Sequence, residues 1–367
     1  MKEIIKSRIQ RLRKILENTE KDALLLSREE NIAYLTLGAR NHITLNNTEG
    51  VASILITNED VYFLTDNIEM NRLFNEEIPE PLHELFKKAE YRWWQSEYDR
   101  LSDLVKIKNL ISDTGRYMTK NVSTDINTYR YVLSNFEFSI LRSLGKVIDE
   151  VFYKNMPRLN SDMSELDVQA LFFREFFKMG YEPILILVFG EESSKLYRHN
   201  LPRDAKLGNH CFVSFCIRHK GLVISSTRSI LFTESTTIRE QHEKNCRIDA
   251  KIISLSRPGV KMDELFSGIE KAYDAEGYPD EWMLHHQGGL AGYKSRELVC
   301  TPNTRYTLME GNCIAWNPTI TGTKSEDTAI VLKGANEICS FPPSSQWPEL
   351  EFQFNGVTIR RPDIILL

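Results

Sequence analysis

The stretch that decides the fold is CFVSFCIRHKGLVISSTRS, residues 211–229, where runs of apolar and β-branched residues lie on both sides of a polar turn. Two later stretches are also strand-like: HHQGGLAGYKSRE at residues 285–297 and GNCIAWNPTITGTKSEDTAI at residues 311–330. Between the first and second of these stretches, the segment from Met262 to Glu276 has the pattern of a helix. This alternation predicts an α/β domain in the second half of the chain.

Two amphipathic helices are predicted upstream of these strands. Beyond Phe136, apolar residues recur at helical spacing on one face, namely Ile140, Leu141, Leu144, Val147, Ile148, Val151 and Phe152. A second helix is predicted to begin at Ser164, because the run Ser164-Glu165-Leu166-Asp167 resembles a capping box. The domain therefore combines long helices with its strands.

The first part of the chain has a different texture. It opens with a predicted amphipathic helix, and residues 52–66, ASILITNEDVYFLTD, read as two β-rich runs around a polar turn. This pattern predicts a small α/β domain over residues 1–125, followed by the larger domain over residues 126–367.

Composition limits the classes of partner and the compartment. The chain has 367 residues, of which 41% are hydrophobic and 26% charged, and its net charge of −5 predicts neither a nucleic-acid nor a membrane partner. No apolar run reaches membrane-spanning length. The six cysteines form no CxxC pair, so the sequence predicts a protein of the reducing cytoplasm without disulfides.

The segment from Cys211 to Ser229, together with residues 285–297 and 311–330, resembles the C-terminal domain of the Xaa-Pro peptidase, prolidase and creatinase family, peptidase M24. The resemblance implies a pita-bread domain, in which helices cover a curved antiparallel sheet, preceded by a smaller creatinase-like α/β domain. It also implies a homodimer.

The same resemblance implies where metal ligands would lie. In this family two aspartates eleven residues apart, one histidine and two glutamates hold two divalent metal ions. The matching positions here are Ser214, Ser225, Gly289, Asn317 and Glu326, of which only Glu326 is kept. One carboxylate cannot offset the charge of two divalent ions, so no metal and no cofactor is predicted.

A replacement zinc site is not predicted either. Adjacent residues of an extended segment point to opposite faces, so His285 and His286 are expected to diverge. No third ligand stands at a recognisable spacing from them. The missing imidazole at Gly289 is instead expected to leave a cavity that could admit substrate.

Two residues are candidates for catalysis. His199 matches a family histidine that is not a metal ligand, and imidazole suits proton transfer near neutral pH. Glu326 could orient an imidazole or bind a substrate cation. The structural alternatives are a histidine that ties down a loop and a carboxylate that accepts hydrogen bonds on its strand.

The predicted substrate contacts are Arg296, His285, His286 and Asn317. Arg296 could hold a substrate carboxylate or stabilise an oxyanion, and the alternative is a pair with the neighbouring Glu297 or another acid.

Two functions follow from the resemblance. The first is a metal-independent hydrolase that cleaves a C–N bond in a small amino-acid-like or dipeptide-like substrate, with His199 and Glu326 used in the manner of creatinase. The alternative is an inactive pita-bread protein that binds peptides or partner proteins.

Overall fold

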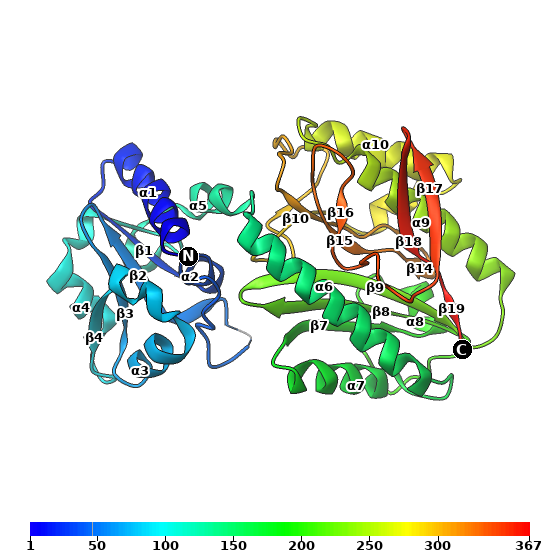
Figure 1. The fold of residues 1–367 in the computed structure, drawn as a ribbon, viewed down its shortest axis with the longest axis horizontal. Helices are drawn as coiled ribbons and strands as arrows, with labels where there is room; N and C mark the ends of the chain where they lie inside the picture. The colour runs from blue at the N-terminus through cyan, green and yellow to red at the C-terminus, as the bar shows by residue number, and fades with distance from the viewer. Residues whose placement is uncertain (46) are drawn as a thin grey trace. The chain divides into compact units, whose positions relative to one another are not determined.

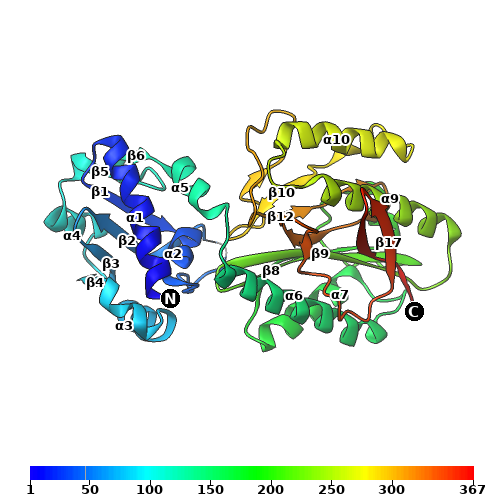
Figure 2. The same ribbon diagram turned by 45° about the horizontal axis from the view of Figure 1, so that its top comes forward.

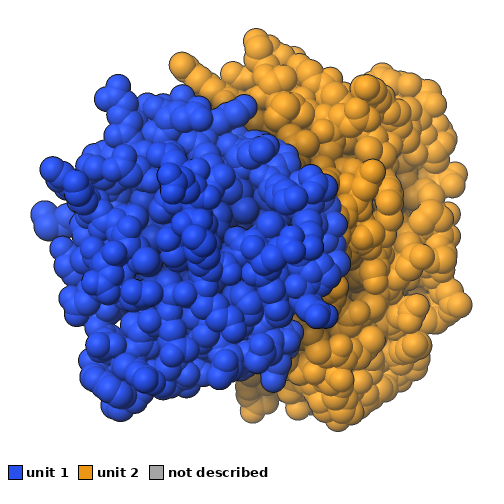
Figure 3. Space-filling model, turned by 60° about the vertical axis from the view of Figure 1, so that its left-hand side comes forward, with its two compact units in different colours: residues 1–130 blue, residues 131–367 orange. Residues whose placement is uncertain are grey.

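The computed structural model describes residues 1–45 and 47–367. The chain forms two compact units, residues 1–130 and 131–367 (Figure 3). The division falls after Arg130 rather than near residue 125, because helix α5 (Ser123–Arg130) packs with the first unit. There the buried Arg130 guanidinium donates to the side chain of Asn31.

The first unit is built on a six-stranded sheet with strand order β4-β3-β2-β1-β5-β6 (Figure 1). Helix α1 (Lys2–Thr19) buries one apolar face, as its sequence pattern predicts. The predicted polar turn separates β2 from β3, which pair antiparallel. The other main elements are β1 (Ala23–Arg28), α2 (Glu29–Thr36), β2 (Glu49–Thr57), β3 (Val61–Asp66), α3 (Met70–Arg72), β4 (Lys87–Tyr91), α4 (Glu97–Leu104), β5 (Leu110–Ser112) and β6 (Lys120–Asn121).

The second unit is organised by a curled, mainly antiparallel sheet with the order β11-β10-β12-β15-β9-β8-β7. Its longest pair is the hairpin of β8 (His210–His219) and β9 (Leu222–Leu231), whose turn contains Gly221 in the left-handed region, at φ 77°. Strand β19 (Ile365–Leu366) adds to β9 in parallel. The other strands are β7 (Glu182–Phe189), β10 (Gly288–Ala291), β11 (Leu298–Val299), β12 (Cys313–Trp316), β15 (Asp327–Ile330) and β16 (Glu337–Ile338).

Helices α6 (Asn135–Asn155) and α7 (Glu165–Lys178) cover the β7 to β9 part of this sheet (Figure 2). Capping boxes open both helices, and that of α7 is at Ser164, where the sequence predicts it. Phe152 of α6 stacks on Phe172 of α7, with ring centroids 4.9 Å apart, and both rings contact Phe215 of β8. Aromatic packing therefore fixes the helices to the strand that carries Ser214.

Helices α9 (Thr236–Leu255) and α10 (Met262–Ala275) pack on the β10 and β12 part of the sheet, around a core that includes Trp316 and Tyr273. The indole of Trp316 donates to Ser256, and the Tyr273 hydroxyl donates to Gln287, just before β10. The remaining strands form two small hairpins, β13 (Thr319–Ile320) with β14 (Thr323–Lys324), and β17 (Glu349–Phe354) with β18 (Val357–Pro362).

No helix among the described residues is long and apolar enough to cross a membrane.

Candidate functional site

The positions that match metal ligands of the resembled family lie on or beside five strands of one sheet. Ser214 lies on β8, Ser225 on β9 and Gly289 on β10, while Asn317 follows β12 and Glu326 precedes β15. All five residues are buried. The fold thus brings together residues that are far apart in the sequence, and their chemistry decides what the site can bind.

Glu326 is held by two cations, the buried Lys324 and the half-buried Arg296. Its Oε1 accepts from Arg296 Nη2 at 2.7 Å, and its Oε2 lies 2.7 Å from Lys324 Nζ. The side chains of Lys324 and Glu326 are 5% and 4% exposed, so water screens this pairing weakly. Burial opposes the carboxylate charge, but the two cations outweigh burial and lower the pKa of Glu326 to about 2. Glu326 is therefore ionised at neutral pH and is too weak a base to take a proton from water.

Both serine positions are tied into this group by hydroxyl contacts. Ser214 Oγ lies 2.8 Å from Thr227 Oγ1, and Thr227 donates to Glu326 at 3.2 Å. Ser225 Oγ accepts from Arg296 Nη1 at 3.2 Å. The hydroxyls thus serve side chains of the protein itself, and each is almost fully buried.

The expectation of a cavity at Gly289 is wrong. A Cβ atom on this glycine would lie 2.1 Å from the carbonyl oxygen of Leu298, on the neighbouring strand β11. The φ angle of +152° also disfavours any residue with a side chain. The space that a ligand imidazole would need is therefore filled by backbone.

These residues do not fit the dinuclear metal centre of the resembled family. Of the five matching positions, only Glu326 supplies a carboxylate, and Lys324 and Arg296 already occupy its two oxygens. Two side-chain cations thus stand where two metal ions would share carboxylate ligands, and further positive charge there would meet repulsion.

A second group of polar residues, the histidine cluster, comprises His199, His285 and His286. Ordered neighbours anchor the loop that carries His199: Arg198 binds Glu281 at 2.6 Å, and Asn200 donates to Val188 O at 2.7 Å. Glu281 belongs to the short helix η6 (Glu281–Leu284), which directly precedes His285. This ion pair therefore links the two segments that supply the cluster.

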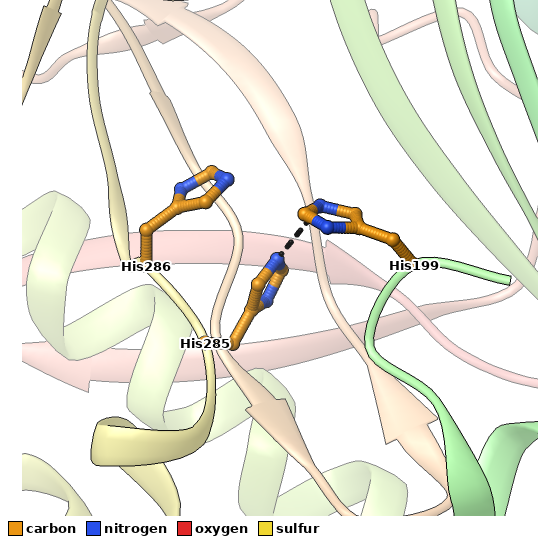
Figure 4. Close-up of side chains that lie close together, drawn as sticks. All are labelled: His199, His285 and His286. Atoms are coloured by element: carbon orange, nitrogen blue, oxygen red, sulfur yellow. Dashed lines mark hydrogen bonds between the residues drawn. The ribbon is translucent and has the colours of Figure 1, made fainter.

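The three imidazoles come together at one point (Figure 4). His285 Nε2 lies 3.2 Å from His199 Nε2 and 3.4 Å from the amide nitrogen of Asn317. The ring centroids of His285 and His286 are 4.6 Å apart. The expected divergence of these two rings is wrong, because residues 285–287 belong to no strand, so strand alternation does not apply to them.

The surroundings keep the histidine cluster neutral. Burial and the nearby Lys324 ammonium lower the pKa of His285 to about 2, and partial burial of the ring and Arg296 lower the pKa of His286 to about 4. Burial and Lys324 also lower the pKa of His199. At neutral pH the rings are thus uncharged, whereas Lys324, Arg296 and Glu326 together carry a net charge of +1.

Sequence reasoning did not single out Lys324 and Arg198. Lys324 had a detectable signal, because residues two apart on an extended segment share a face and Lys324 stands two positions before Glu326. Arg198 had none, since its partners Glu281 and Thr321 are remote in the sequence.

The curved sheet with its covering helices, and the ligand-like positions on its strands, define a pita-bread protein of the creatinase and prolidase type. Residues 139–359 match the model of metallopeptidase family M24, and residues 8–137 match the creatinase/prolidase N-terminal domain. The chain belongs to metallopeptidase family M24.

Solved structures share this fold at low sequence identity. The chain is similar to an Xaa-Pro dipeptidase from Bacillus anthracis, with 18% identity, a TM-score of 0.76, and coverage of 92% of this chain and 98% of the other. It is also similar to a prolidase from Pyrococcus horikoshii OT3, with 17% identity, a TM-score of 0.74 and the same coverages.

The N-terminal domain of the FACT complex subunit SPT16 from chickpea has 10% identity and a TM-score of 0.71, with coverage of 94% of this chain and 98% of that domain. No curated protein matches the chain.

Proposed function

We propose that the second unit hydrolyses a C–N bond in a small amino-acid-like or dipeptide-like substrate without the dinuclear centre of its family. The observation that carries the proposal is the Arg296–Glu326–Lys324 group beside the histidine cluster. Fixed cations next to an imidazole provide an electrophilic site and a proton carrier, the two functions that amide or amidine hydrolysis requires.

In this proposal His199 carries the proton. Asn317 Nδ2 and His199 Nε2 both face His285 Nε2. We therefore assign His285 Nε2 as the hydrogen-bond acceptor and place a proton on Nε2 of His199, which leaves Nδ1 of His199 free to act as the base. Nδ1 of His199 then takes a proton from water as the water oxygen bonds to the substrate carbon. The same proton passes to the nitrogen as the C–N bond breaks.

Arg296 and Lys324 are proposed to bind an anionic group of the substrate or the developing oxyanion. Their net charge with Glu326 is +1, and Arg296 Nε is buried without a hydrogen-bond partner. An anion therefore fits this site better than the guanidinium of creatine does. Glu326 acts by holding both cations in place, and Asn317, His285 and His286 border the substrate.

The test is mass spectrometry of a mixture of dipeptides and modified amino acids after incubation with chelator-treated protein. We expect a hydrolysis product, and His199→Ala should lower its rate by about 10²- to 10⁴-fold. His219→Ala, which changes a histidine outside the cluster, is the matched control. A product that forms only after a divalent metal is restored would overturn metal independence.

A second candidate function is peptide or partner binding without catalysis. Large apolar side chains next to the cluster in sequence are exposed, at 66% for Leu196, 77% for Leu201 and 60% for Leu284, and apolar anchors of this kind suit a bound peptide. Saturable peptide binding with no product in the mass-spectrometric screen would favour this function.

We also propose that the protein is a homodimer of the reducing cytoplasm that binds no nucleic acid. All six cysteines are free and buried, and the net charge is −5. Light scattering coupled to size-exclusion chromatography tests the dimer, and a monomeric mass at micromolar concentration would contradict it.

A further inference from the structure

The histidine cluster is distinct from the five positions that match the family's metal ligands. One ligand nitrogen from each of His199, His285 and His286 lies within 4.8 Å of the other two. Three imidazoles with one open position are a donor set that zinc and related transition metals accept in proteins. The cluster is therefore a candidate site for a single metal ion, separate from the family's dinuclear centre.

The distances require only small adjustments to enclose one ion. Tetrahedral zinc with Zn–N bonds of about 2.0–2.1 Å places its ligand nitrogens roughly 3.3–3.4 Å apart. His199 and His285 already meet this spacing, at 3.2 Å. His199 and His286 are exposed, so solvent leaves room for their side chains to adjust, whereas His285, only 7% exposed, is the fixed member.

An unpartnered oxygen lies beside the fixed ligand. The side chain of Asn317 is 2% exposed, and its Oδ1 has no hydrogen-bond partner although its amide nitrogen lies 3.4 Å from His285 Nε2. A buried amide oxygen without a donor is costly. Rotation of the Asn317 amide would exchange its nitrogen and oxygen and bring Oδ1 to the side of His285 Nε2. There Oδ1 could accept a hydrogen bond from a water molecule on the ion or contact the ion itself.

We propose that His199, His285 and His286 bind one transition-metal ion of the imidazole-preferring kind, such as Zn²⁺ or Co²⁺. The cluster contains no carboxylate, and Lys324 and Arg296 stand nearby. Hard ions that depend on anionic oxygen ligands, such as Mg²⁺ and Ca²⁺, are excluded by this donor set. The bound ion would withdraw His199 from proton transfer, so it inhibits rather than activates the proposed hydrolysis.

The test measures binding to the full chain rather than turnover. Chelator-treated protein is titrated with Zn²⁺ by calorimetry, with Co²⁺ by visible absorption, and with Mg²⁺ for comparison. We expect one Zn²⁺ per chain, a Co²⁺ spectrum typical of tetrahedral nitrogen ligands, and no Mg²⁺ binding. A stoichiometry other than one, or an octahedral Co²⁺ spectrum, would overturn the proposal.

Variants locate the ion. His286→Ala and His199→Ala change partly exposed rings, and each should weaken Zn²⁺ binding by at least about 10-fold, whereas His219→Ala should leave it unchanged. Lys324→Met removes a neighbouring positive charge and should tighten binding by at least about threefold. Unaltered affinity in His286→Ala, or equal weakening in His219→Ala, would refute the site.

These outcomes do not depend on turnover. A protein that hydrolyses its substrate but binds no Zn²⁺ would refute the metal site and leave the proposed function standing. A protein that binds one Zn²⁺ at the cluster but yields no hydrolysis product would refute the proposed function and leave the metal site standing.

Discussion

Replacement of Glu326 by glutamine tests whether Lys324 and Arg296 depend on this carboxylate. The substitution keeps the shape of the side chain and removes its charge, so Lys324 and Arg296 lose their shared partner. Burial and the two cations together move the pKa of Glu326 from an ordinary value of 4.5 to about 2. A shift of this size corresponds to about 3 kcal/mol of preference for the charged form.

The expected loss in unfolding free energy is therefore about 3–5 kcal/mol, the range for breaking a buried ion pair by removing one partner. Urea unfolding at pH 7, followed by the fluorescence of the buried Trp316 and Trp347, measures this loss. Lys324→Met is the matched control. It leaves Glu326 paired with Arg296 and removes one of two like charges, so it should cost less than Glu326→Gln.

The pH dependence has a definite sign. The pKa of Glu326 is depressed in the folded state, so its contribution to stability is complete above pH 4.5 and is lost as pH falls towards about 2. The difference between parent and Glu326→Gln should shrink over this window. A loss below about 1 kcal/mol at pH 7, or a difference that does not vary with pH, would refute the reasoning.

Three further predictions follow from other residues. Gly289→Ala places a Cβ 2.1 Å from Leu298 O and should lower the unfolding free energy by more than about 2 kcal/mol, and an unchanged urea midpoint would contradict this close approach. Burial lowers the pKa of His210 to about 3. The contribution of His210 to the unfolding free energy is therefore complete above its ordinary pKa of 6.5 and is lost on acidification, by about 2 kcal/mol at pH 5. In urea titrations His210→Phe should lose about 2 kcal/mol less unfolding free energy than the parent between neutral pH and pH 5. The same pH profile in variant and parent would show that His210 does not cause the loss. Arg198→Met breaks the pair with Glu281 and should reduce the rate on the screened substrate with little change in unfolding free energy; a rate equal to that of the parent would show that His199 needs no such anchor.

Much of the fold could be predicted from the sequence because its signals are local. The strand pair around Gly221 and the capping box at Ser164 depend on neighbouring residues, and both are present in the structure. Ser214 and Ser225 also lie on two paired strands, β8 and β9, where Ser214 is opposite Thr227 and Ser225 is opposite Cys216.

The site was harder to predict because its contacts are not local. Lys324, on β14, and Arg296, in the loop between β10 and β11, meet at Glu326, and no sequence pattern indicates that Arg296 will face this carboxylate. The convergence of His285 and His286 depends on a break between η6 and β10. At Gly289 the missing side chain suggested empty space, but only the position of β11 shows that backbone fills it.

The close approach of β11 to Gly289 also bears on whether the metal ligands of the family could be introduced into this chain. Histidine at this position would collide with the Leu298 carbonyl before it could reach an ion, and a carboxylate at Ser225 would first meet Arg296. A family ligand introduced singly at either position thus enters surroundings that do not accommodate it. To build the family's ligand set in this chain would require several substitutions together with a shift of the β11 backbone.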